Sequence, residues 1–94
     1  MAGGYKGLHM IVSGVVQGVG FRYYILRIAQ SFAVNGWVRN RYDSSVEIYA
    51  EGEASSLQGF LKEVRVGPRH AHVTDIKIDW QEYKGEHKDF RIVG

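Results

Sequence analysis

The 94-residue sequence predicts a single domain, residues 1–94, with an α+β fold in which two helices lie on one face of an antiparallel sheet. Two kinds of hydrophobic periodicity support this prediction. Four runs alternate apolar with polar residues, as half-buried strands do, and two runs space apolar residues three and four apart, as amphipathic helices do. Their order is βαββαβ, followed by a short closing strand, and we expect the two-layer sandwich known as ferredoxin-like.

The first half of the chain predicts a strand followed by a helix. Residues 1–6 are small and polar, and we expect them to be frayed. Residues 8–13 alternate as a strand does. From Phe21 onward, apolar residues recur at helical spacing, which predicts a helix of about 13 residues. Asn35-Gly36 is the expected stop signal, because glycine can take the left-handed conformation that ends a helix.

A hairpin is predicted next. Residues 37–42 have strand character, with Val38 and Tyr42 expected on one face, and residues 46–51 alternate as a second strand. The polar cluster Asp43-Ser44-Ser45 between them is typical of a turn.

The last part of the chain predicts a helix and two strands. Apolar residues at positions 57, 60, 61 and 64 form a helical stripe that stops at Gly67-Pro68. Residues 75–80 alternate as a strand, and residues 90–92 indicate a short final one.

The composition narrows the classes of function. Lysine and arginine number 12 against 10 for aspartate and glutamate, and this excess of positive charge mildly favours anionic partners. The sequence lacks, however, the clustered basic run of a dedicated nucleic-acid binder. The absence of cysteine excludes a disulfide framework, a thiol nucleophile and a thiolate metal site. His70 and His72 have no third ligand at matching spacing, so we expect neither a metal nor another cofactor. No segment resembles a membrane span or a signal peptide, and we expect a cytoplasmic protein.

The stretch from Gly14 to Arg22 predicts a phosphate-binding loop. Its glycines can take left-handed conformations in which successive backbone N–H groups converge on one anion, and the helix that follows adds unpaired N–H donors. Arg22 lies at the unfavourable end of the helix dipole, and a bound dianion would offset that cost of about 0.3–1 kcal/mol. A second interpretation stays open, in which the glycines only make a tight turn and Arg22 is a solvated surface residue.

Two familiar glycine motifs are excluded for this loop. No Gly-Lys-Ser/Thr follows, as a Walker A loop requires, and Tyr23 stands where the dinucleotide-binding fingerprint requires a third glycine. ATP and NAD are therefore not expected as ligands.

The predicted topology brings Asn40 to the same edge of the sheet as the phosphate-binding loop. In a split βαβ unit the first two strands are parallel and the third lies between them, so the carboxyl ends of the first two share one edge of the sheet. The loop follows the first strand and Asn40 lies toward the end of the second. An ordinary strand-end asparagine is the alternative interpretation.

Two segments of the sequence resemble the hallmark segments of the acylphosphatase family. They are Val16-Gln17-Gly18-Val19-Gly20-Phe21-Arg22 and Gly36-Trp37-Val38-Arg39-Asn40, and the similarity continues to Phe90-Arg91-Ile92. The resemblance implies a metal-free hydrolase that splits the anhydride of a carboxylate and a phosphate. The substrate would be a small-molecule acyl phosphate, with inorganic phosphate as product and inhibitor. We expect a monomer with no nucleic-acid or membrane partner.

The resemblance also implies a role for each matching residue. Asn40 would position the attacking water, and the phosphoryl group would be bound by Gln17, Gly18, Val19, Gly20, Phe21 and Arg22. The sequence departs from the family pattern at Ser44, because glycine usually follows the aspartate of the hairpin turn. Serine tolerates a positive φ less well than glycine, and the geometry of this turn is therefore in question.

Two other functions share parts of this pattern. RNA-recognition modules have the same βαββαβ order and read bases with aromatic residues on the exposed sheet face, but the outward positions here are Glu47, Tyr49 and Glu51, which are mostly acidic. An acylphosphatase-like module that handles carbamoyl phosphate within a larger enzyme is the closer alternative. The length of 94 residues favours a stand-alone hydrolase.

Overall fold

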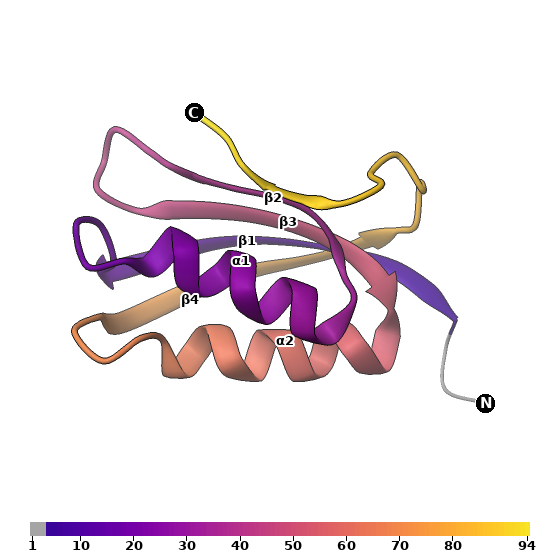
Figure 1. The fold of residues 1–94 in the computed structure, drawn as a ribbon, viewed down its shortest axis with the longest axis horizontal. Coiled ribbons are helices and arrows are strands. Elements are labelled where there is room, and N and C mark those ends of the chain that lie inside the picture. Colours follow the sequence, from indigo (N-terminus) through magenta and orange to yellow (C-terminus); the bar gives the residue numbers. More distant parts are fainter. Residues whose placement is uncertain (1–3) are drawn as a thin grey trace.

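The computed structural model describes residues 4–94, and its elements follow the predicted order (Figure 1). They are β1 (Tyr5–Val15), α1 (Phe21–Phe32), β2 (Asn35–Asn40), β3 (Val46–Glu53), α2 (Ala54–Val66), β4 (His72–Glu82) and β5 (Phe90–Ile92). Of the segment expected to be frayed, residues 1–3 lie outside the described residues. For Tyr5 and Lys6 that expectation is wrong, because both pair with β3 as part of β1.

The five strands form one sheet in the order β4-β1-β3-β2-β5. β1 and β2 each run antiparallel to β3, so they are parallel to one another with β3 between them, as the sequence predicts. The predicted antiparallel sheet is observed for β1 to β4, and it contains one parallel pair, because the short β5 pairs parallel with β2. The chain leaves β4 at the end of the sheet where β2 begins, and it therefore enters β5 in the direction of β2 (Figure 1).

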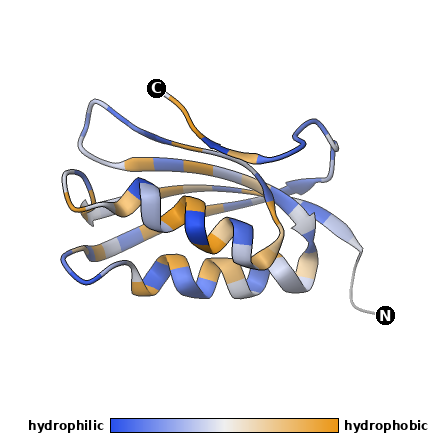
Figure 2. Ribbon diagram, in the orientation of Figure 1, coloured by the Kyte–Doolittle hydropathy of each residue, from blue (hydrophilic) through white to orange (hydrophobic). Residues whose placement is uncertain are grey.

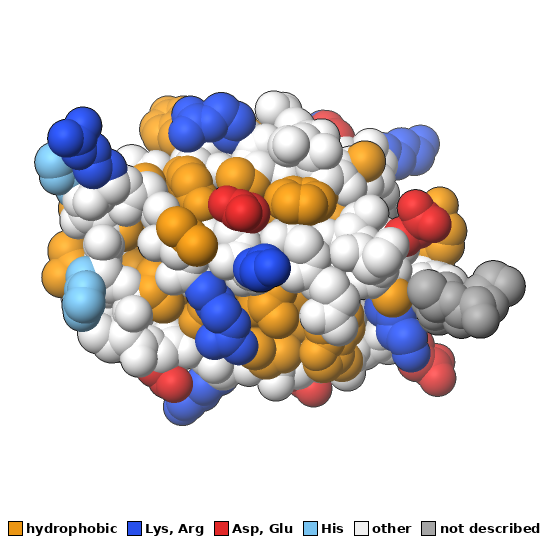
Figure 3. Space-filling model, turned by 90° about the horizontal axis from the view of Figure 1, so that it is seen from below, with side chains coloured by type: hydrophobic (Ala, Val, Ile, Leu, Met, Phe, Trp, Pro, Cys, Tyr) orange, Lys and Arg blue, Asp and Glu red, His pale blue; other side chains and the backbone are white. Residues whose placement is uncertain are grey.

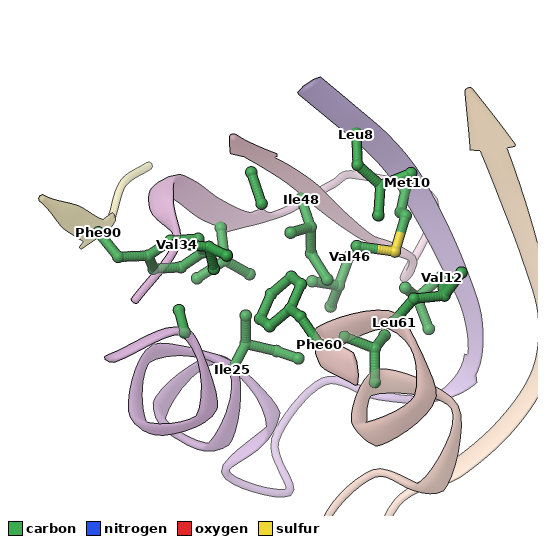
Figure 4. Close-up of a cluster of buried hydrophobic side chains, with 14 of the residues drawn as sticks. Leu8, Met10, Val12, Ile25, Val34, Val46, Ile48, Phe60, Leu61 and Phe90 are labelled. Atoms are coloured by element: carbon green, nitrogen blue, oxygen red, sulfur yellow. The ribbon is translucent and has the colours of Figure 1, made fainter. Parts of the chain in front are cut away.

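Both helices lie on the same face of the sheet, and the core fills the space between the two layers (Figure 1). Hydrophobic and hydrophilic segments alternate along each helix, as expected of helices with one buried face (Figure 2). In Figure 4 the buried side chains of the two layers meet, with Ile25 and Phe60 on the helices and Met10, Val46 and Ile48 on the strands. This core fixes β1 and β2 relative to each other, and with them the segments that follow their carboxyl ends.

α1 has 12 residues, close to the predicted length, but its stop signal differs from the prediction. Its last residue is Phe32, and the residue that takes the left-handed conformation after it is Ala33, with φ 57°, rather than Gly36. This conformation lets the N–H of Val34 donate back to the Ala29 carbonyl at 3.0 Å, which satisfies one of the last helical carbonyls. The predicted stop at Asn35-Gly36 is therefore wrong, and these two residues begin β2.

β2 is also shorter than the predicted strand 37–42. The N–H of Arg41 donates to the carbonyl of Ser45 at 2.9 Å, so the chain turns directly after Asn40. Tyr42 is fully exposed in that turn and does not share the buried face of Val38, contrary to the prediction. Asn40 is thereby placed at the very end of the strand.

The face of the molecule on the side of α2 carries charges of both signs. In Figure 3 the lysine and arginine side chains of the described residues are scattered among acidic and hydrophobic ones and do not gather into a basic stripe. This face therefore lacks the clustered positive charge typical of a nucleic-acid interface.

Candidate active site

The loop between β1 and α1, residues 16–20, holds two glycines in the left-handed conformation. Gly18 has φ 73° and Gly20 has φ 76°, values that residues with a side chain rarely adopt. Apart from its own chain neighbours, a Cβ atom on either glycine would meet no atom of the described residues within 4 Å, so the backbone conformation rather than crowding requires glycine here. The open space in front of both residues leaves their backbone accessible to a ligand.

The backbone amides of this loop and of the first turn of α1 are not used within the fold. Among the described residues, no group accepts a backbone hydrogen bond from the amides of residues 17–23, and the first helical bond runs from Tyr24 N to Gly20 O at 3.1 Å. No side chain caps α1, and its first turn holds no acidic residue. Amides arranged in this way at a helix N-terminus attract anions. These unpaired amides make the loop a candidate anion site.

Arg22 adds a cation to these amides from the first turn of α1. Among the described residues, no carboxylate lies within salt-bridge distance of it, whereas Arg39 of β2 pairs with Glu47 at 2.7 Å. A cation at this end of the helix opposes the helix dipole at a cost of about 0.3–1 kcal/mol. An anion bound by the amides would turn this unfavourable charge into a favourable one.

Asn40 presents an unpaired acceptor at the end of β2. Its Oδ1 atom is buried, and no donor among the described residues reaches it. A buried acceptor without a partner costs about 1–3 kcal/mol, so such atoms call for a functional explanation. Asn40 also lines a cleft of about 450 Å³ together with Arg39, Arg41, Tyr42 and Gly94. A water in this region would supply the missing donor.

The structure brings the loop and the end of β2 together. The Gln17 side chain donates from Nε2 to the backbone carbonyls of Arg41 and Ser45, both at 2.9 Å. In Figure 1 the loop after β1 and the turn after β2 lie at the same end of the sheet. The prediction that the loop and Asn40 share one edge of the sheet is thus confirmed. Sequence reasoning did not find this contact of the Gln17 side chain, because it depends on where the turn begins.

The turn between β2 and β3 keeps a left-handed residue although glycine is absent. Ser44 has φ 73°, which is the conformation that glycine adopts most readily at such positions. Around it the Asp43 carboxylate accepts from the N–H of Ser45 at 3.1 Å and from its hydroxyl. The hydrogen bond from the Ser45 hydroxyl lowers the pKa of the Asp43 carboxyl below its usual value. Asp43 thus stays an acceptor that shapes the turn.

A hydrogen-bonded group of charged side chains lies beside the site on the open face of the sheet. Glu47 accepts from His9 at 2.7 Å and from Nε of Arg39 at 2.7 Å. Burial acts to raise the pKa of Glu47, but these two hydrogen bonds and the Arg39 charge hold it below its usual value. The charge of Arg39 is therefore largely balanced by Glu47, unlike that of Arg22.

Between residues 4 and 94, no three side chains of histidine, cysteine, aspartate or glutamate lie close enough together to hold a metal ion. No helix in the same part of the chain combines the length and apolar character needed to cross a membrane.

Comparison with known proteins links this chain to one family. The acylphosphatase family model matches residues 8–92 of the chain. The acylphosphatase of Moorella thermoacetica is 49% identical over 84 residues, which cover 89% of this chain and 89% of that protein.

Solved structures give the same result for the fold. The crystal structure of the acylphosphatase from Bacillus subtilis superposes with a TM-score of 0.92 at 42% identity, over 95% of this chain and 99% of that one. Full-length HypF, solved in a phosphate- and nucleotide-bound form, superposes with a TM-score of 0.83 at 32% identity, over 96% of this chain but only 12% of that one. The ferredoxin-like arrangement predicted from the sequence is confirmed by these similarities.

Proposed function

Because the chain belongs to the acylphosphatase family, we propose that it hydrolyses the carboxyl-phosphate anhydride of acyl phosphates to a carboxylate and inorganic phosphate. The observation that carries the proposal is the set of unpaired backbone amides at residues 17–23 together with the Arg22 cation. This arrangement suits the phosphoryl group of such a substrate, which is a compact anion that gains charge on its oxygens during transfer.

In this proposal the loop binds the phosphoryl group. The backbone amides of the loop donate to its oxygens, and the planar guanidinium of Arg22 donates to them as a two-pronged fork. The residues that provide these donors are Gln17, Gly18, Val19, Gly20, Phe21 and Arg22. Because the amides are fixed by the left-handed glycines before substrate arrives, little reorganisation is needed as charge develops.

Asn40 directs the nucleophile in the same proposal. Its buried Oδ1 accepts a hydrogen bond from a water, which attacks the phosphorus in line with the bond to the carboxylate oxygen. The new P–O bond forms as the old one breaks, the carboxylate leaves with the bonding electrons, and the water proton passes to phosphate or solvent. A carboxylate leaves without protonation, so the proposed site needs no strong general acid.

An RNA-binding role is not supported by the open face of the sheet. Tyr49 and Glu51 are 9% and 2% exposed, and the Tyr49 hydroxyl donates to Glu51 at 3.0 Å. Burial, together with this hydrogen bond, raises the pKa of Tyr49 to about 12. The backbone N–H of His87 donates to the same carboxylate at 3.1 Å, and its ring lies 5.5 Å from that of Tyr49. Tyr49 is thus covered and does not offer a surface on which a base could stack.

The experiment that tests the proposal is an assay of acetyl phosphate or benzoyl phosphate with phosphate release as the readout. We expect hydrolysis that is unaffected by a chelator and competitively inhibited by inorganic phosphate. An alkyl phosphate should be left intact, because its alkoxide leaving group requires an acid. Activity that disappears with chelator and returns with magnesium or zinc would contradict the metal-free mechanism.

Carbamoyl phosphate in a parallel reaction tests the alternative. It contains the same type of anhydride, so some hydrolysis is expected. A kcat/KM for carbamoyl phosphate well above that for acetyl phosphate would instead favour a carbamoyl-phosphate-handling module.

A further inference from the structure

The side chain of Gln17 joins the phosphate-binding loop to the turn between β2 and β3. Its single amide nitrogen donates to the carbonyl of Arg41 and to that of Ser45, both at 2.9 Å. Both N–H donors of the amide are therefore engaged by the turn. Arg41 is covalently bonded to Asn40, so the contact lies one peptide away from the residue proposed to hold the attacking water.

The turn has internal hydrogen bonds that do not involve Gln17. Arg41 N donates to Ser45 O at 2.9 Å, and Ser44 N donates to Arg41 O at 3.3 Å. The Asp43 carboxylate accepts from the Ser45 N–H at 3.1 Å. These bonds shape the turn itself. The two bonds from Gln17 instead fix where the turn stands relative to the loop.

We propose that Gln17 is a positioning residue, whose side chain sets the placement of Asn40 relative to the phosphoryl group held by the loop. The inference rests on the proposed function, in which Asn40 holds the attacking water. In-line attack requires an accurately placed nucleophile, and a displacement of about 1 Å costs on the order of 10²-fold in rate. Because both side-chain donors are occupied by the turn, Gln17 serves the phosphoryl group through its backbone N–H.

This assignment makes a prediction about kcat and phosphate binding. Gln17→Ala should lower kcat by roughly tenfold to a hundredfold, while the inhibition constant for inorganic phosphate stays within about threefold of wild type. Gln17→Glu keeps the shape of the side chain but places a carboxylate against two carbonyl oxygens. Its kcat should therefore fall at least as far as that of Gln17→Ala. Steady-state kinetics with acetyl phosphate and phosphate as inhibitor measure both quantities.

A double-mutant cycle with Asn40→Ala tests whether Gln17 acts through Asn40. If it does, adding Gln17→Ala to Asn40→Ala should lower kcat by no more than about twofold further, because the placement of a missing side chain no longer matters. If the two losses multiply, Gln17 acts independently of Asn40 and the inference is overturned. An Asn40→Ala variant with wild-type kcat would instead overturn the proposed role of Asn40 itself, which keeps the two failures distinguishable.

Asn35→Ala is the matched control. The Asn35 side-chain amide donates to the His87 carbonyl at 3.2 Å, so it makes the same kind of bond at the opposite end of β2. We expect a small loss of melting temperature for both Asn35→Ala and Gln17→Ala, with kcat unchanged only for Asn35→Ala. Equal kcat values in Gln17→Ala, Gln17→Glu and wild type would show that the contact is structural alone.

Discussion

At Asn40 the fold leaves a buried acceptor that no donor of residues 4–94 reaches. Replacing Asn40 should therefore lower kcat while the stability of the fold and the affinity for phosphate change little. Asn40→Ala should lower kcat by about 10²–10³, as expected when one well-placed polar group is lost from a transition state. The inhibition constant for phosphate should stay within a few fold, because the loop and Arg22 still bind the anion. Steady-state kinetics check both, and a phosphate affinity that fell in step with kcat would make Asn40 a binding residue.

Sequence reasoning at this scale found the residues but not all of their partners. Arg22 and Asn40 could be singled out because each belongs to a sequence motif with recognisable residue types and spacing. The hydrogen bonds of the Gln17 side chain could not be predicted, because they depend on the turn starting directly after Asn40. The sequence extended that strand to Tyr42, which would have moved the two acceptor carbonyls away from Gln17.

At the scale of elements, the turn between β2 and β3 contains a strained residue. Ser44 has φ 73° and an exposed side chain, and a left-handed residue with a Cβ costs roughly 1–2 kcal/mol. Ser44→Gly should remove most of that strain, and the greater freedom of glycine in the unfolded chain offsets part of the gain. We expect a net stabilisation of about 0.5–1 kcal/mol, measured by denaturant unfolding, with kcat within twofold of wild type.

Ala33→Gly is the matched control for this prediction. Ala33 has φ 57° at the end of α1, so it carries the same kind of strain away from the loop and the turn. The Ala33→Gly variant should be stabilised by about as much as Ser44→Gly, with no change in kcat. Stabilisation at Ala33 together with destabilisation at Ser44 would show that the serine side chain supports the turn.

Ala33 also explains why the stop signal of α1 was mispredicted. Glycine is the usual residue in the left-handed position after a helix, and the sequence offers one at Gly36. The helix instead ends with the strained Ala33, because Val34 must reach the core, where it is 2% exposed. Tertiary packing outweighed the local preference for glycine.

For the whole molecule, the sequence predicted the two layers and the crossover between β1 and β2 better than the edge strand β5. The periodicities of the long elements and the parallel relation of β1 and β2 were confirmed, since both follow from patterns of many residues. The direction of β5 depended on a strand of three residues and on the path of the chain before it. Neither leaves a periodic signal in the sequence.

Binding of phosphate at the loop should stabilise the whole molecule, because a ligand that binds only the folded chain shifts the folding equilibrium. At a phosphate concentration a hundredfold above Kd, the gain is about 2.7 kcal/mol. For a domain of this size it corresponds to a rise of roughly 10–20 °C in melting temperature. Arg22→Gln should lose most of this shift, and Arg22→Lys should restore little, because an ammonium group cannot reproduce the planar fork.

The apo protein provides the sharper comparison. Without phosphate, Arg22 faces the positive end of α1, and no carboxylate of the described residues balances its charge. The Arg22→Gln variant should therefore be as stable as wild type, or more stable by up to about 1 kcal/mol. Arg27→Gln, which removes an exposed arginine from the same helix, is the control and should keep the full phosphate shift. Melting temperatures of the three proteins across a phosphate titration at fixed ionic strength decide the matter. Equal phosphate-induced shifts in melting temperature for all three proteins would mean that the anion binds without Arg22. Unspecific ionic screening would also affect all three proteins alike. Only a loss of the shift that is confined to Arg22→Gln therefore assigns the phosphate to the loop.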